Sequence, residues 1–125
     1  NQVEELFLKA CENGNLKLVK FLIEKGADVN KANNWNQTAL YIASENGNLE
    51  LVKFLIENGA DVNKANNDDK IPLHIACEKG YLEIVKFLIE NGTDIKKADV
   101  DGYNPLILAC REGYLEIVKF LVEKS

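Results

Sequence analysis

Few side chains in this sequence of 125 residues could do chemistry, and they comprise one histidine and three cysteines. His74 and Cys77 stand three residues apart, a spacing that places both on one face of a helix, where they could approach a common metal ion. Zinc needs four protein ligands, or three with an open position, and no further ligand stands in register with this pair. The sequence therefore predicts no metal site and no cofactor.

No nucleophile–base arrangement or pair of carboxylates departs from the regular spacing described next, and the glycines never cluster into a loop that could cradle a phosphate. We therefore expect no catalytic residues and no enzyme activity. The question becomes which elements position the remaining side chains.

The chain repeats itself every 33 residues. The tetrapeptide VKFL begins at Val19, Val52, Val85 and Val118. Glycine recurs in the same phase at 14, 47, 80 and 113, and alanine at 10, 43, 76 and 109. Such in-phase copies indicate an array of four units.

One unit, over residues 38–66, predicts two helices followed by a polar segment. The stretches TALYIASEN and NLELVKFLIEN have helical apolar spacing, and each ends at a glycine, as helices often do. Thr38 is placed to cap the first helix, and Pro72 and Pro105 suit the first helical turn of later units. The segment ADVNKANNWNQ is too polar for a core, so we expect a projecting loop or hairpin.

These residues resemble the ankyrin repeat family over essentially the whole chain. TALYIA (38–43), IPLHIA (71–76) and NPLILA (104–109) stand in the place of its T-P-L-H-x-A motif, and GADVN (26–30, 59–63) looks like its hairpin stretch. The resemblance implies an all-α solenoid of four stacked helix-turn-helix repeats with projecting β-hairpin loops. It also implies a structural, hydrogen-bonding role for His74.

We expect a single domain over residues 1–125, with repeats near 1–32, 33–65, 66–98 and 99–125. Ile71, at a threonine position, cannot cap its helix, so that helix start should be weaker by roughly 1 kcal/mol. Glu5 and Lys9 predict a polar end for the first unit. The last unit is as apolar as the interior ones, so either further repeats follow it, which we favour, or a partner or second copy covers it.

Cys11, Cys77 and Cys110 share one repeat position, which Ser44 fills in the other unit. This pattern predicts a small buried side chain, and helices stacked roughly 8–10 Å apart are too distant for a disulfide. The odd number of cysteines and the absence of a secretory signal favour reduced thiols and an intracellular, cytoplasmic or nuclear location.

The net charge of −5 disfavours nucleic acid as a partner, because phosphate binding needs clustered Lys and Arg. No window is long and apolar enough for a membrane helix. We therefore expect a monomer that binds a protein partner, with self-association through the last unit as a second possibility.

Positions whose residue differs between units are not required for the core that all units share. The resemblance implies that loop tips and the inner face of the first helices bind partners. The predicted protein-binding residues are Asn34, Trp35, Gln37, Tyr41, Glu45, Asn46, Asp68, Lys70, Lys79, Val100, Asp101, Tyr103, Arg111 and Glu112. They include the single Trp and single Arg, residue types that dominate interface hot spots. Trp35 is expected either to contact the partner or to lie across a neighbouring loop.

The leading interpretation is a non-catalytic interaction module, a scaffold or adaptor. Its alternatives are a self-assembling structural unit and a regulatory or docking segment of a larger enzyme. The irregular helix starts at Ile71 and Asn104 argue against an engineered consensus binder, in which threonine would stand there.

Overall fold

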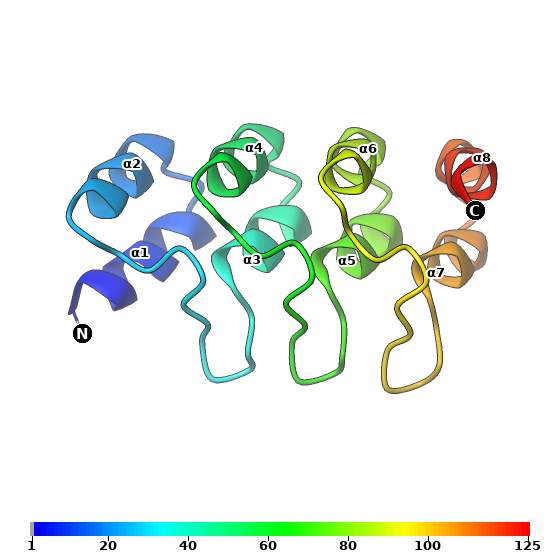
Figure 1. The fold of residues 1–125 in the computed structure, drawn as a ribbon, viewed down its shortest axis with the longest axis horizontal. Coiled ribbons are helices and arrows are strands. Elements are labelled where there is room, and N and C mark those ends of the chain that lie inside the picture. The colour runs from blue at the N-terminus through cyan, green and yellow to red at the C-terminus, as the bar shows by residue number, and fades with distance from the viewer. Residues whose placement is uncertain (1) are drawn as a thin grey trace.

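The structure, a computed structural model, describes residues 2–125 and folds them into helices arranged in two rows (Figure 1). In chain order the helices of this part are α1 (Gln2–Glu12), α2 (Leu16–Glu24), α3 (Ala39–Glu45), α4 (Leu49–Glu57), α5 (Pro72–Lys79), α6 (Leu82–Glu90), α7 (Pro105–Glu112) and α8 (Leu115–Lys124). Each odd-numbered helix packs on the next even-numbered one and on the odd helices beside it. The predicted all-α stack of four helix pairs is thereby confirmed.

Each helix pair falls within one of the four expected repeats, and we propose the bounds 1–32, 33–65, 66–98 and 99–125 on that basis. Three loops, between α2 and α3, α4 and α5, and α6 and α7, project on the same side of the stack beneath the odd row (Figure 1). The repeat therefore sets three similar loops in a line.

The inner helices α3, α5 and α7 begin in two different ways. The Thr38 hydroxyl accepts a hydrogen bond from the Tyr41 N–H (3.2 Å), and the Asn104 side chain accepts one from the Ile107 N–H (2.9 Å). Ile71 offers no such cap, but its own N–H donates to the His74 ring (3.0 Å). The weaker helix start expected at Ile71 is thus partly offset by a side chain reaching back from inside the helix.

The loops are less regular than the β-hairpins that were expected. Within residues 2–125 no β-strand forms, and the only isolated β-bridge joins Ala32 and Thr38 in antiparallel orientation. Asn36 and Asp69 turn the chain with positive φ angles of 61° and 60°, and Gly102 does so with 84°. Asn, Asp and Gly tolerate this left-handed region best, which explains why those types stand there.

The buried core runs continuously along the stack and ends in exposed apolar side chains at α8. Leu115 is 61% exposed and Val122 is 56% exposed, whereas Leu82 and Ile89, at the same positions one unit earlier, are partly buried. The next unit covers these positions inside the array. The expected burial of all three cysteines is therefore wrong at Cys110, which is exposed for the same reason.

The first unit is only partly the polar end that was expected. Glu5 and Lys9 are exposed, but Leu6 and Phe21 are also about half exposed. The counterparts of Phe21 in later units each lie under a lysine of the unit before, as Phe54 lies under Lys20 at 5.5 Å. Both ends of the described stack thus carry apolar side chains of the kind that interior units bury against each other.

Candidate interaction surface

Each projecting loop is closed around one polar residue, which is Asn33, Asn66 or Asp99. The side-chain oxygen Oδ1 of this residue accepts two backbone N–H groups from its own loop, at 2.8–3.0 Å. The donors are Trp35 and Gln37 in the first loop, Asp68 and Lys70 in the second, and Asp101 and Tyr103 in the third. These bonds fix the backbone of each tip before any partner binds.

The three loops are also bonded to each other. The Asn67 N–H donates to the Trp35 carbonyl, and the Val100 N–H donates to the Asp68 carbonyl, both at 3.0 Å. The tips therefore form one connected row rather than three independent loops (Figure 1).

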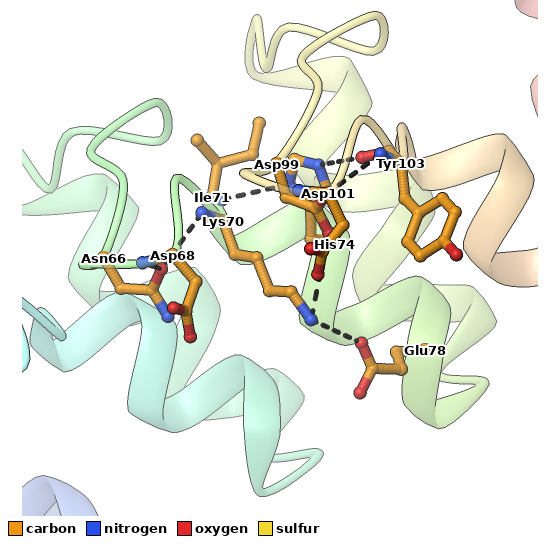
Figure 2. A network of polar contacts seen from close by, with 9 residues as sticks. All are labelled: Asn66, Asp68, Lys70, Ile71, His74, Glu78, Asp99, Asp101 and Tyr103. Carbon is orange, nitrogen blue, oxygen red and sulfur yellow. Dashed lines mark hydrogen bonds and ion pairs between the residues drawn. The ribbon is translucent and has the colours of Figure 1, made fainter.

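His74 joins an inner helix to the following loop (Figure 2). Its Nδ1 accepts the Ile71 N–H at 3.0 Å, and its Nε2 lies 3.2 Å from the Tyr103 carbonyl. Two such partners require a neutral ring with the proton on Nε2. Burial lowers the pKa of His74 below its ordinary value and so favours this neutral form, which fits a structural role.

Lys70 spans two loops from a half-buried position (Figure 2). Its Nζ lies 3.1 Å from Glu78 Oε1 and 4.0 Å from Asp99 Oδ2. The Asp99 side chain is almost fully buried, and within residues 2–125 its Oδ2 has no hydrogen-bond donor. Lys70 therefore links the second loop to α5 through Glu78 and to the third loop through Asp99, in addition to lying near the tips.

Replacing Asp99 with alanine is expected to lower the free energy of unfolding by about 1.5 kcal/mol, because two backbone N–H groups lose their acceptor. Asp99→Asn should cost only about 0.5 kcal/mol, since Asn33 and Asn66 accept the same two N–H groups with an amide and only the long contact with Lys70, at 4.0 Å, is lost. Urea denaturation followed by circular dichroism measures both. Equal losses for the two variants would contradict this account of the loop.

The predicted binding residues divide by exposure. The exposed ones are Asn34, Trp35, Asn46, Asp68, Lys79, Val100, Asp101, Tyr103, Arg111 and Glu112, and Gln37, Glu45 and Lys70 are half buried. Tyr41 is only 4% exposed, in contrast to the contact role expected of it. Burial raises the pKa of the Tyr41 hydroxyl.

Two predicted residues that lie apart in the sequence meet in space. The Arg111 guanidinium on α7 stacks over the Tyr103 ring, 4.9 Å from its centre. Trp35, in the first loop, is 65% exposed, and Val100, in the third, is 59% exposed. Large apolar side chains therefore lie exposed at the first and third tips.

A groove of about 580 Å³ between α1 and the first loop was not predicted from the sequence. Leu6 and Leu8 on α1 and Ala32 and Trp35 on the loop are its apolar lining residues. The sequence feature that could have indicated it is Leu8, which stands at the position of Tyr41 and His74 in later units. Leucine is smaller than tyrosine and fills less of the space beside the loop.

The described residues contain no group of three or more His, Cys, Asp or Glu side chains that could hold a metal ion. Burial raises the pKa of the Cys11 and Cys77 thiols to about 12, which keeps them protonated and weakly nucleophilic. None of the helices described in residues 2–125 has the length and hydropathy to cross a bilayer.

Stacked helix pairs with a row of projecting loops define the class of helical repeat solenoids. The family model for ankyrin repeats (3 copies) matches residues 4–66 and 64–125. The chain belongs to the ankyrin repeat family.

A putative ankyrin repeat protein of Acanthamoeba polyphaga mimivirus is 53% identical over 32 residues. That match covers 26% of this chain and 5% of the viral protein, so the chain matches only a small part of this relative's length.

Proposed function

We propose that this chain is a non-catalytic protein-interaction module that binds a partner protein through its loop tips and inner helix face. Ankyrin repeats are generally modules of this kind. The observation that carries the proposal is the exposure of Trp35, Val100 and Tyr103 on a row of hydrogen-bonded loops. Exposed aromatic side chains on a rigid support are typical of interface hot spots.

The rigidity of the tips supports this function. Each tip is closed by bonds to Asn33, Asn66 or Asp99, and His74 and Lys70 tie the second and third loops to α5 and to each other. A surface that is ordered beforehand loses less conformational entropy on binding. We propose that the partner is met inside the cell, in the cytoplasm or nucleus.

Replacing both Trp35 and Tyr103 with alanine is expected to weaken partner capture at least tenfold, because the anchors at the first and third tips are removed. The measurement is affinity capture with the wild-type chain and the variant, followed by a binding titration with the captured protein. The control variant carries Glu57→Ala and Glu90→Ala, two exposed positions near the ends of the outer helices α4 and α6. Undiminished capture by the double aromatic variant, with unchanged circular dichroism, would remove the loop tips from the site.

A second candidate function is self-assembly through the end of the stack formed by α7 and α8. Its specific support is the exposure of Leu115, Val122 and Ile107, because the residues at the same positions in interior units are buried or partly buried. Light scattering across a concentration series should then show association that Leu115→Lys reduces. A wild-type chain that stays monomeric at high concentration would exclude this candidate.

A further inference from the structure

Each projecting loop is closed by a residue at one repeat position and carries a second side chain four positions further on. These pairs are Asn33 and Gln37, Asn66 and Lys70, and Asp99 and Tyr103. Of these residues only Asp99 has a carboxylate and only Lys70 an ammonium group. The two charges face each other across the junction between the second and third loops, with 4.0 Å from Lys70 Nζ to Asp99 Oδ2 (Figure 2).

One oxygen of the Asp99 carboxylate shapes the third loop, and the other faces the second loop. Oδ1 accepts the N–H groups of Asp101 and Tyr103, both at 2.9 Å. Oδ2 is buried, has no hydrogen-bond donor within residues 2–125, and lies opposite the Lys70 ammonium group. The side chain is 1% exposed, so water screens its charge poorly. A displacement of this carboxylate would therefore move the third tip with it.

Lys70 is itself anchored to the stack. Its Nζ lies 3.1 Å from Glu78 Oε1 on α5, and its side chain is only 22% exposed. Gln37, at the same position in the first loop, instead accepts the Asn33 Nδ2 group at 3.0 Å and so is bonded within its own loop. Within residues 2–125 no ion pair joins the first loop to the second. The charged link is therefore specific to the second and third loops.

Two backbone hydrogen bonds allow the two loop junctions to be followed separately. The Val100 N–H donates to the Asp68 carbonyl at 3.0 Å and joins the second and third tips. The Asn67 N–H donates to the Trp35 carbonyl at the same distance and joins the first and second tips. Since only the first of these junctions holds a charged pair, exchange of the two amide hydrogens with solvent reports on what that pair does.

The loss of one charge from this pair has a different cost from the loss of the other. Without Asp99, Lys70 keeps Glu78 as its partner and stays partly exposed. Without Lys70, Asp99 is a buried carboxylate with no other ion-pair partner among the described residues. A buried charge that loses its partner is destabilising, whereas removal of both charges is often neutral. We therefore expect the third loop to shift toward water when Lys70 alone is neutralised, and to stay in place when both residues are neutral.

We propose that Lys70 is a positioning residue of the interaction surface. It sets the place of the third tip relative to the second through Asp99, and it does not itself contact the partner. Its ammonium group lies between two carboxylates, whereas Asp68, Val100 and Asp101 at the same tips are exposed. This inference rests on the proposed function and gives Lys70, which the repeat pattern selected as a contact residue, a different role in it.

Lys70→Gln gives the second loop the residue that the first loop has at this position. The Val100 amide hydrogen should then exchange at least about fivefold faster, measured by NMR at constant pH, while that of Asn67 stays unchanged. Lys70→Arg should restore slow exchange, because a guanidinium can also donate to two carboxylates. The matched control is Lys64→Gln, which changes an exposed lysine of the same inter-helix segment that has no ion pair among the described residues.

An Asp99→Asn background separates positioning from contact. Lys70→Gln should weaken binding of the captured partner at least about fivefold in the wild-type chain, but should change neither binding nor Val100 exchange by more than about twofold in that background. An equal loss of binding in both backgrounds would show that Lys70 touches the partner and would overturn the inference. So would Val100 exchange that does not respond to Lys70→Gln in the wild-type chain. The exchange measurement needs no partner, so the expected exchange without any captured protein would count against the proposed function alone.

Discussion

Replacing His74 with alanine is expected to lower the free energy of unfolding by about 3 kcal/mol. The substitution leaves a cavity in a fully buried site, and it leaves the buried Ile71 N–H without an acceptor. It also removes the donor to the Tyr103 carbonyl, which ties the third loop to α5 (Figure 2). Urea denaturation followed by helical circular dichroism measures this loss.

A second variant separates the hydrogen bond from the cavity. The His74→Asn side chain can still accept the Ile71 N–H, because its amide oxygen stands as many bonds from the backbone as the ring Nδ1, so its loss should be about half as large. A loss below about 1 kcal/mol for alanine would show that His74 does not hold the loop to the helix.

The role of His74 also sets the direction of a pH effect. Because burial lowers its pKa, the unfolded chain takes up the proton first as the pH falls below about 6.5. The contribution of neutral His74 to the free energy of unfolding is therefore complete above that pH. It declines as the pH falls toward the pKa of the folded state, by up to about 1.4 kcal/mol per pH unit. The advantage of the wild type over His74→Asn should shrink between pH 7.5 and 5.5, whereas a constant difference would assign the effect to other groups.

The sequence was sufficient for the helices because their signals are local and repeated. Thr38 predicted the start of α3, and glycine 47 predicted its end near Glu45. Thirty-three-residue spacing then placed the other pairs by register, since each unit meets the same neighbours. The register could not predict how Ile71 begins its helix, because His74 supplies that bond from the following turn.

Exposure was harder to predict, because it depends on which neighbour covers a position. Tyr41, His74 and Ile107 share one register position, yet Tyr41 and His74 are buried under the next loop and Ile107 is 39% exposed. Cys110 differs from Cys77 in the same way. The repeat position shows which residues are equivalent, but whether a residue is exposed depends on the loop or unit packed over it. The binding residues chosen by repeat position therefore include Tyr41, which is buried.

The second large loss of stability is expected where an aromatic ring packs on a glycine. Gly80 ends α5 with a φ of +84°, and a Cβ there would lie 2.8 Å from the Tyr114 ring of the next unit. Gly92 has nearly the same φ, +87°, but nothing lies within 4 Å of its Cβ position. The two sites share the backbone strain of a left-handed alanine and differ in the space available.

Gly92→Ala is therefore expected to lower the free energy of unfolding by about 1 kcal/mol, the cost of the left-handed backbone alone. Gly80→Ala should cost about 2.5 kcal/mol, because the rigid Tyr114 ring must also move off the surface on which it packs. Thermal and urea unfolding of both variants measure the difference. In a Tyr114→Ala background the excess cost at Gly80 should disappear, since no ring remains to be displaced. If the two glycines cost the same in the wild-type background, the ring-on-glycine contact is not what makes glycine necessary at the end of α5.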